Sequence, residues 1–481
     1  MARQSSFSKE ALEKLGAARL AELVWDGAER DAAFRKIVKA ALAGVKGPDA
    51  VAALIDRRLA ALAKARGMVE WEKTRAFAAD LAATVDTISR ELGRAAPALA
   101  CDRLVTFLET SDAVVGRCDD SNGVVQAVYD NAAEATAALA AQIGKAEQLA
   151  LASRVCGLIG RDGWSYFKGL ATSLVPLLDA GQLQELDGEL AANPDAKSKE
   201  PGFSRHSRVQ VRQAIADARH DADAYIALAK QLPDRQLDPL EIASRLLAAG
   251  RAQEALDWMK QPARKGIGYM TAAGMADGGA IQMSGDRPRA VLEAEILDAL
   301  GRRDEAQAVR WTYFAASLDG DMLKAYVAKA PEFEDVEALD RAFAHALASP
   351  HRYGALQFLL EWPRLDLAAR HVLAHADAWD GARYHTLAPV AEMLEPDHPL
   401  AAGILYRALL GVILAKARSA AYNHAAAYWH RLNRLDAEIK AEQWTGAGHL
   451  VHSHYVATIK AAHGRKAAFW AGVEAGKGKK G

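Results

Sequence analysis

Apolar residues recur at helical spacing along most of the chain. Within 49–66, one face of a helix would carry Val51, Leu54, Ile55, Leu59 and Leu62. The same spacing runs through 207–232, with a break near Asp221. Side chains three and four positions apart share a helix face, so this pattern predicts amphipathic helices.

The segment Pro399–Arg418 is apolar on nearly every side. A helix without a polar face must be buried, so we expect this one at the centre of its domain, with Pro399 in the first turn. No segment alternates convincingly between apolar and polar residues. The sequence therefore predicts an all-α fold without a sheet.

Composition supports this prediction and narrows the class of protein. Alanine is the commonest residue, followed by other good helix formers, and 60 Lys and Arg stand against 61 Asp and Glu. This balance removes the global argument for a nucleic-acid binder. The longest strongly apolar run, Ala408–Ala415, is too short for a membrane span, and the N-terminus lacks the apolar core of a secretory signal. Because the three cysteines lack paired spacing, we expect a cytoplasmic protein without a disulfide framework.

Two breaks organise the chain. Residues 192–206 contain two prolines and mixed charge, which predicts a linker between an N-terminal helical domain (1–191) and a C-terminal domain (207–481). Residues 262–288 hold six glycines and predict a long loop. It is either a binding lid or a mobile insertion, and the insertion is favoured because no phosphate-binding motif falls inside it.

The C-terminal domain contains a weak internal repeat. Gly250-Arg251-x-x-Glu254-Ala255 recurs as Gly301-Arg302-x-x-Glu305-Ala306. Glycine permits a positive φ where a helix ends, and alanine permits close helix packing. The sequence predicts a helical bundle followed by stacked, tetratricopeptide-like helix pairs, an α-solenoid-like arrangement whose concave face would bind a protein partner.

Catalytic signatures are missing: the chain has no H-E-x-x-H, C-x-x-C, G-x-S-x-G or Walker motif. Cys101, Cys118 and Cys156 are expected to act as small buried apolar residues. Twelve of the fourteen histidines lie from His345 onward. The weak candidates for a zinc site are His371, His375, His449, His452 and His454. No cysteine or glutamate accompanies them at ligand spacing, so no cofactor is expected and zinc is the alternative.

Two polar stretches in the N-terminal domain have structural and functional interpretations. Asp119, Asp120 and Ser121 precede an apolar stretch and are expected to cap a helix, in preference to a cation site. Residues 57–75 are basic around Trp71, so this stripe could follow a phosphate backbone. A solvated helix face is the more common explanation, and nucleic acid is kept as an alternative partner.

The C-terminal motif runs from His463 to Trp470. We expect Gly464 to end a helix in the left-handed conformation, and Phe469 and Trp470 to anchor the chain end to the core. The alternative is an anion or acidic-partner site made by His463, Arg465 and Lys466. The anchor is favoured, and the two interpretations are compatible.

Several motifs together resemble an uncharacterised, bacterial, all-helical family that is catalogued only as a domain of unknown function. They are Val69-Glu70-Trp71-x-Lys73, Arg117-x-Asp119-Asp120-Ser121-x-Gly123, Ala306-Gln307-x-x-Arg310-Trp311, His398-Pro399-Leu400-Ala401-Ala402, Leu405-Tyr406-Arg407, His452-x-x-Tyr455 and His463-Gly464-Arg465-Lys466-x-x-Phe469-Trp470. Related helical segments occur in SWIM-type zinc-finger proteins, but the C-x-C and C-x-H ligand pairs of that finger are missing here. The resemblance implies a helical, tetratricopeptide-like fold and no known activity.

These observations favour a helical scaffold or adaptor over an enzyme. The alternatives are a metal- or anion-binding factor or enzyme that uses the histidine-rich C-terminal block, and a nucleic-acid accessory protein that uses residues 57–75. The candidate binding residues are Trp71, Asp119, Asp120, Ser121, Arg310, Trp311, His452, His463, Arg465, Lys466 and Trp470.

Overall fold

The structure is a computed structural model, and helices account for 78% of it. This helix content confirms the all-α prediction. The structure describes residues 8–161, 163–192, 201–233, 236–262, 267–278, 282–331, 334–446 and 448–477. No helix among these residues is both long and apolar enough to span a lipid bilayer. The chain divides into two compact units, residues 1–238 and 239–481.

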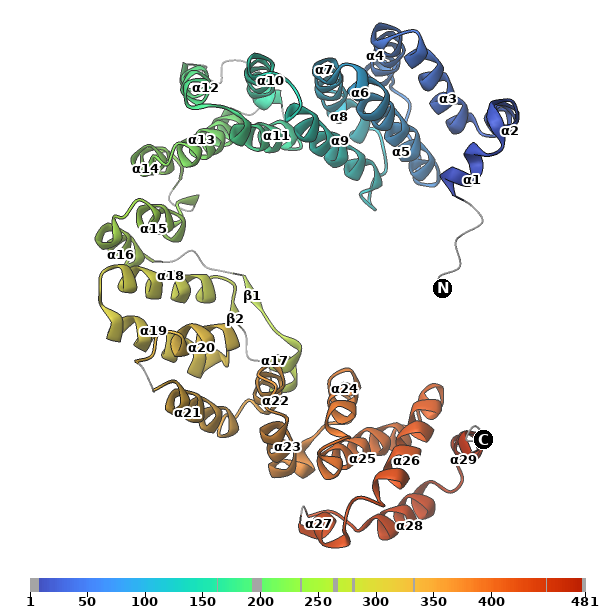
Figure 1. Cartoon of the computed structure of the whole chain (residues 1–481), viewed down its shortest axis with the longest axis vertical. Coiled ribbons are helices and arrows are strands. Elements are labelled where there is room, and N and C mark those ends of the chain that lie inside the picture. Colours follow the sequence, from blue (N-terminus) through green and yellow to red (C-terminus); the bar gives the residue numbers. More distant parts are fainter. Residues whose placement is uncertain are drawn as a thin grey trace. The chain divides into compact units, whose positions relative to one another are not determined.

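The first unit, blue to green in Figure 1, contains fourteen labelled α-helices and three short helices of other types within the described residues. They are α1 (Lys9–Glu13), α2 (Gly16–Arg30), α3 (Ala32–Val45), α4 (Pro48–Lys64), α5 (Trp71–Asp86), the π-helical η1 (Thr87–Leu92), α6 (Gly93–Ala95), α7 (Pro97–Leu108), α8 (Ser111–Val115), α9 (Val124–Ala140), α10 (Lys145–Leu158), η2 (Ile159–Arg161), α11 (Tyr166–Leu174), η3 (Val175–Leu177), α12 (Ala180–Ala192), α13 (Pro201–Ala218) and α14 (Ala222–Ala229).

The core of the first unit is formed where α9 packs against α5, α7 and α11. Phe107 and Tyr129 are fully buried and stack with ring centres 4.7 Å apart. The predicted apolar face of α4 points inward, because Val51, Ile55 and Leu59 are at most 3% exposed. The spacing of apolar residues therefore identified the buried side of this helix.

The second unit runs from yellow-green to red in Figure 1. Its elements are α15 (Pro239–Ala248), α16 (Ala252–Met259), β1 (Gly268–Tyr269), α17 (Ala272–Ala276), β2 (Gln282–Met283), α18 (Asp286–Ala299), α19 (Arg303–Ser317), α20 (Gly320–Val327), α21 (Asp335–Leu347), α22 (Arg352–Glu361), α23 (Leu365–Ala374), η5 (Ala376–Ala378), α24 (Tyr384–Leu394), α25 (Pro399–Ala415), η6 (Ser419–Ala421), α26 (Tyr422–Leu435), α27 (Ala441–Gly446), α28 (His452–His463) and α29 (Ala467–Lys477).

Helix α25 lies at the centre of the second unit's core, as its apolar sequence predicts. It packs against α23, α24 and α26, and Leu405, Leu409 and Leu410 are fully buried. Pro399 occupies the first turn, where its missing N–H breaks no helical hydrogen bond.

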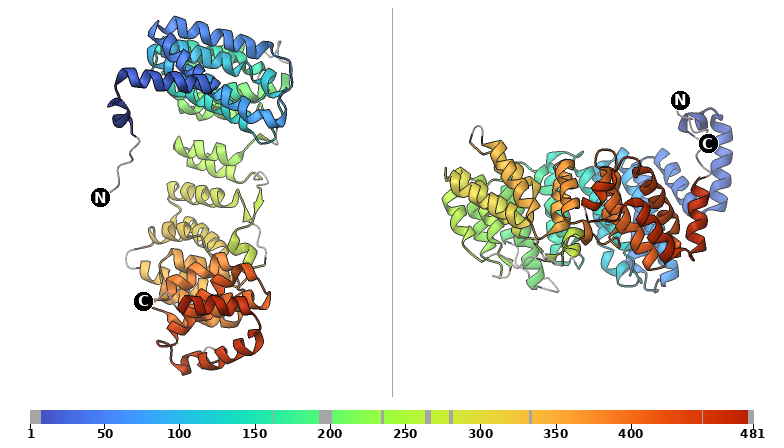
Figure 2. Two further views of the ribbon diagram at one scale, coloured as in Figure 1. Left: turned by 90° about the vertical axis from the view of Figure 1, so that its right-hand side faces the viewer. Right: turned by 90° about the horizontal axis from the view of Figure 1, so that it is seen from below.

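Helices α15 and α16 pack together as one pair, and α18 and α19 pack together as the next. Within each pair, one of the predicted glycine links joins the two helices. Gly250 and Gly301 both have φ of +75°. In each link the following arginine N–H closes the helix end, from Arg251 to the Leu246 carbonyl at 2.8 Å and from Arg302 to the Leu297 carbonyl at 2.9 Å. The left-hand view of Figure 2 shows these pairs as successive layers, yellow-green to yellow.

Among the described residues, the same hydrogen bond combined with a positive φ closes three further helix ends, at His220, Ala417 and Gly448. Their positive φ values are 54°, 50° and 75°. Two of these links lack glycine, so a search of the sequence for the glycine motif does not detect them.

Two features differ from the expectations. The predicted absence of any sheet is corrected by β1 and β2, which form a two-residue antiparallel ladder within the glycine-rich segment. The units divide after Asp238, beyond the predicted linker, because α13 packs against α11, η2 and α12 of the first unit. Residues 193–200 of that linker lie outside the described residues.

Candidate functional site

A groove of about 470 Å³ opens on the second unit between the glycine-rich segment, the α19–α20 connection and α22. One side is formed by Tyr269, Thr271 and Asp277. The opposite side includes Ser317–Asp321, and α22 contributes residues as far as Trp362. The groove thus joins three stretches that are distant in sequence.

Asp277 fixes the glycine-rich segment to α22. Its carboxylate accepts hydrogen bonds from the backbone N–H groups of Tyr353, at 2.8 Å, and Gly354, at 2.9 Å. These amides belong to the first turn of α22, where N–H groups lack helical partners and a negative charge is favoured by the helix dipole. Arg383 also donates to the Met275 carbonyl at 3.2 Å. The described part of the segment is therefore held against the helices.

Carboxylates outnumber basic groups along the groove. Its lining includes Asp277, Asp286, Asp319, Asp321 and Glu361, against Arg287, Lys324 and His351. The Arg287 guanidinium contacts Asp319 at 2.8 Å and Asp321 at 3.1 Å, and Lys324 contacts Asp321 at 3.1 Å. The hydrogen bond from Lys324 lowers the pKa of Asp321, and the hydrogen bond to Asp319 raises the pKa of Arg287. The groove stays acidic after these pairings.

Sequence reasoning did not find this groove. The sequence indicates the glycine-rich segment, but the acidic residues at 286, 319, 321 and 361 show no common spacing. Only the packing of α18, α19 and α22 brings them together.

The acidic turn before α9 caps that helix, in agreement with the capping interpretation. The two carboxylate oxygens of Asp120 accept from the N–H groups of Val125 and Gln126, each at 2.9 Å. The Asp119 carbonyl accepts from the buried Thr74 hydroxyl at 3.1 Å, whereas Ser121 is exposed. Trp71, the first residue of α5, is 57% exposed.

The basic stretch 57–75 is partly neutralised within the first unit. Arg58 pairs with Asp80, and Lys73 pairs with Glu70 at 3.0 Å. Arg57 donates to the Ala53 carbonyl of its own helix at 3.1 Å. These contacts reduce the charge that the stretch presents.

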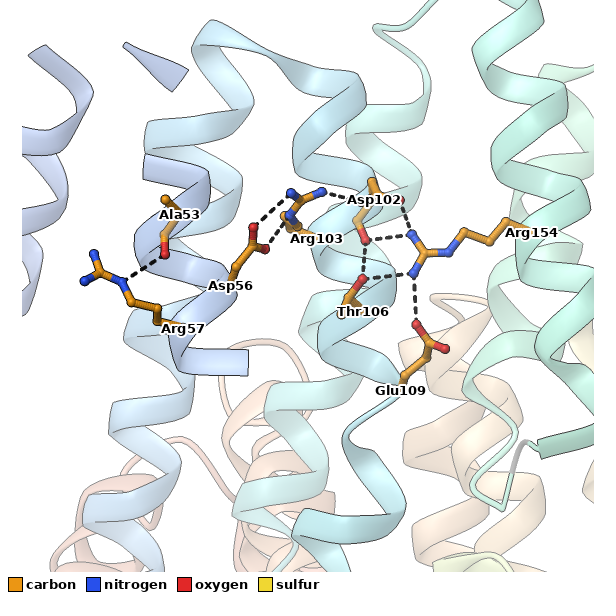
Figure 3. A network of polar contacts seen from close by, with 8 residues as sticks. All are labelled: Ala53, Asp56, Arg57, Asp102, Arg103, Thr106, Glu109 and Arg154. Atoms are coloured by element: carbon orange, nitrogen blue, oxygen red, sulfur yellow. Dashed lines mark hydrogen bonds and ion pairs between the residues drawn. The ribbon is translucent and has the colours of Figure 1, made fainter. Parts of the chain in front are cut away.

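A ladder of charged side chains crosses α4, α7 and α10 (Figure 3). Arg103 binds both carboxylate oxygens of Asp56, at 2.6 and 3.0 Å, and also contacts Asp102. Arg154 in turn contacts Asp102 and lies 2.9 Å from Glu109. We call these five residues the charge ladder. Negative and positive side chains alternate along it, and their contacts tie three helices together.

Arg310 is buried within the second unit and Trp311 is half-buried beside it, and neither lines the groove. Arg310 is 4% exposed and pairs with Asp298 of α18. The Arg341 guanidinium stacks 3.7 Å from the centre of the Trp311 ring. Both residues hold neighbouring helices together.

The candidate metal ligands do not converge. The buried His371 contacts the Arg352 carbonyl through Nε2 at 3.0 Å, and its ring centre lies 4.7 Å from that of His375. His449 faces Asp377 at 3.7 Å, and His454 is exposed. Within the described ranges, no group of three or more His, Cys, Asp or Glu side chains is placed to hold a metal ion.

The cysteines are free thiols in the described structure. Burial raises the pKa of Cys101 and of Cys156 to about 12, so both are protonated at neutral pH. Cys118 is only half-buried, contrary to the expectation of a fully buried residue, because it lies at the loop before α9 where its backbone bridges Val69.

Arg407 is a buried cation without a direct carboxylate partner among the described residues. It is 5% exposed, and its guanidinium lies 3.4 Å from the Trp444 ring centre and 4.3 Å from that of Tyr455. Nη1 donates to the Leu450 carbonyl at 2.7 Å. Burial lowers the pKa of Arg407 to about 10. We call these four residues the arginine clamp, which binds α27 and α28 to α25.

His452 lies beside the arginine clamp and is also buried. Its Nε2 lies 3.2 Å from Oδ1 of Asn433 in α26. Burial is the main cause that lowers the pKa of His452, and the nearby charge of Arg407 acts in the same direction. The contact connects α28 to α26.

The C-terminal motif anchors the chain mainly through Phe469, which is fully buried. Trp470 is half-buried and donates from Nε1 to the His463 carbonyl at 3.0 Å. Arg465 is exposed, and Lys466 is half-buried.

The left-handed conformation expected at Gly464 is wrong, because φ is −57° there. A side chain at this position would place Cβ 2.7 Å from the Lys460 carbonyl oxygen. Close approach to the preceding turn, rather than a positive φ, therefore requires glycine at this position.

Fold and groove together define an all-helical protein with an acidic, partly aromatic groove on its second unit. Residues 2–472 match the model of a family described as a family of unknown function, DUF6880, and the chain belongs to that family. No curated protein and no solved structure matches the chain.

Proposed function

We propose that the chain is a helical scaffold that binds a protein partner, and that the groove of the second unit is the partner's binding site. The observation that carries this proposal is the groove itself, whose volume of about 470 Å³ is open to side chains of another molecule. Its walls are formed by helices and by a segment fixed through Asp277, so the groove exists before a partner arrives.

The same proposal includes a bacterial origin for the chain and a relation to helical segments of SWIM zinc-finger proteins. Here the scaffold would act without that finger.

A steric block of the groove tests the proposal. Ala316 lines the groove from α19 and is exposed, so Ala316→Trp fills the space while keeping the helix surface intact. Thr312 is exposed one turn earlier on α19 and does not line the groove, which makes Thr312→Trp the matched control. Peptides are selected from a random display library on the immobilised full chain.

We expect a set of selected peptides to lose binding to Ala316→Trp and to keep it with Thr312→Trp. Far-ultraviolet dichroism and the melting temperature verify that both variants are folded. Selected peptides that bind Ala316→Trp as tightly as the unmodified chain would reject the groove as the partner site.

A further inference from the structure

We infer that the groove takes a segment rich in lysine and arginine. This inference rests on the proposed function, because it names the chemistry of the partner at the same site. Two observations support it: the groove contains carboxylates without an ion-pair partner, and aromatic rings lie beside them.

Three of the five groove carboxylates already have partners. Asp277 accepts from the first-turn amides of α22. Asp319 accepts from the Met322 N–H at 2.9 Å and pairs with Arg287, and Asp321 pairs with Arg287 and Lys324. These contacts engage the arginine and the lysine of the lining, and His351 is its remaining basic side chain.

Asp286 and Glu361 have no ion pair with any residue in the described part of the chain. Both are exposed, and Glu361 accepts a hydrogen bond from the neutral Gln357 side chain at 2.7 Å. Asp286 belongs to the first turn of α18 and Glu361 to the last turn of α22. Their negative charges come from different walls of one groove, so they can contact the same bound segment.

Aromatic rings line the groove beside these carboxylates. Tyr269 is 45% exposed, and Tyr313 and Trp362 are half-buried. The Lys324 ammonium lies 6.0 Å from the Trp362 ring centre, so this wall already receives one cation. Rings and carboxylates together favour guanidinium and ammonium groups through cation–π and ionic contacts.

Other occupants fit the groove less well. An acidic segment or a nucleic-acid phosphate would meet an excess of negative charge, and an apolar segment would desolvate Asp286 and Glu361 without pairing them. A basic segment compensates these charges and stacks on the rings.

Neutral isosteres test the charge requirement. The double variant Asp286→Asn with Glu361→Gln removes both unpaired charges and preserves side-chain size. The control variant Glu295→Gln with Asp304→Asn changes the net charge equally at exposed positions that do not line the groove. The probes are fluorescein-labelled peptides of alternating arginine and glycine, and of alternating glutamate and glycine, measured by fluorescence anisotropy.

We expect the arginine peptide to bind the unmodified chain and to bind the groove double variant about tenfold more weakly, since two partly exposed ion pairs are lost. The control variant should change the Kd by less than about twofold, as distant charges are screened. Equal binding of the arginine peptide to both double variants, or equally tight binding of the glutamate peptide, would overturn the inference.

The library selection separates the two proposals. If selected peptides lose binding to Ala316→Trp but are not enriched in lysine and arginine, the groove remains the partner site and the inference about its charge fails. If Ala316→Trp affects no selected peptide, the proposed function fails first.

Discussion

Arg154 in the first unit and Arg407 in the second each connect helices of their own unit, but by different physical means. Arg154 belongs to the charge ladder, keeps 30% of its side chain exposed and contacts the carboxylates of Asp102 and Glu109 (Figure 3). Arg407 is 5% exposed and lies between two aromatic rings with a single backbone carbonyl as acceptor. The first arginine is stabilised by opposite charge, and the second by packing.

The effect of burial on the guanidinium pKa is evident at Arg407. A buried guanidinium loses its hydration, and nearby carboxylates usually offset that loss. At Arg407 the pKa falls to about 10, which still leaves the group charged at neutral pH. The arginine clamp therefore holds a charge whose stability depends on close contact with Trp444 and Tyr455, so changes to the rings should matter most.

The largest expected effect comes from Trp444→Ala. Trp444 is fully buried, and its removal leaves a cavity and uncovers one face of the Arg407 guanidinium. We expect the free energy of unfolding to fall by about 3–5 kcal/mol, measured by urea denaturation. Trp71→Ala, at a residue that is 57% exposed, serves as control and should change stability by less than about 0.5 kcal/mol. A loss below about 1 kcal/mol at Trp444 would show that the clamp is not a packed core site.

Shortening the cation itself should have the next largest effect. Arg407→Ala removes the stacked guanidinium and the hydrogen bond to Leu450, and we expect a loss of about 2–3 kcal/mol. Arg407→Met retains most of the apolar stem without the charge, so it should lose clearly less stability than alanine. Equal losses for the two variants in urea unfolding would mean that the charge, and not the packing, stabilises the clamp.

The sequence predicted the helices better than it predicted the charge ladder and the arginine clamp. The apolar face of α4 and the buried helix α25 follow from periodicity, because burial of one face is a local property of a helix. The φ values of Gly250 and Gly301 follow from local chemistry as well, whereas His220 and Ala417 adopt the same conformation without the glycine that signals it.

The sites depend on tertiary packing, which leaves little trace in local sequence. Arg407 belongs to the motif Leu405-Tyr406-Arg407, yet nothing nearby in sequence indicates the rings of Trp444 and Tyr455 that cover it. The groove could not be predicted for the same reason, since Asp286 and Glu361 are brought to one place only by the packing of α18 and α22. The candidate histidines illustrate the reverse case. His371 and His375 lie together at one helix end, in keeping with their spacing, but His449 and His452 face other partners and His454 is exposed.

Acid should weaken the second unit through its buried histidines. Burial is the main cause that lowers the pKa of His371, His449 and His452; Arg407 also lowers the last two, while Asp377 opposes the shift at His449 and Asp436 opposes it at His452. In the unfolded chain these groups take up protons near pH 6.5, so the unfolded state binds more protons below that pH. Stability is therefore complete above about pH 7 and falls as the pH drops through 6.5 towards the lower folded values, by at most about 1.4 kcal/mol per pH unit for each histidine.

Urea unfolding at about pH 7.5, 6.5 and 5.5 measures this slope. His452→Gln should flatten it, because one of the groups that takes up a proton only on unfolding is removed. His424→Gln, at an exposed position on α26, is the control and should leave the slope unchanged. A slope that His452→Gln does not alter would show that His452 is protonated equally in both states.

The smallest effect is expected at the charge ladder, and its dependence on salt distinguishes it from the arginine clamp. Arg154 and Glu109 lie 2.9 Å apart with side chains 30% and 34% exposed, so water and salt screen their attraction. A double-mutant cycle with Arg154→Ala and Glu109→Gln should give a coupling energy of about 0.5 kcal/mol at low salt, falling towards zero at about 0.5 M sodium chloride. The loss caused by Arg407→Ala should change little over the same range of salt, because the clamp excludes water and ions. A coupling energy above about 2 kcal/mol between Arg154 and Glu109 that persists in salt would mean that the two arginines are stabilised in the same way.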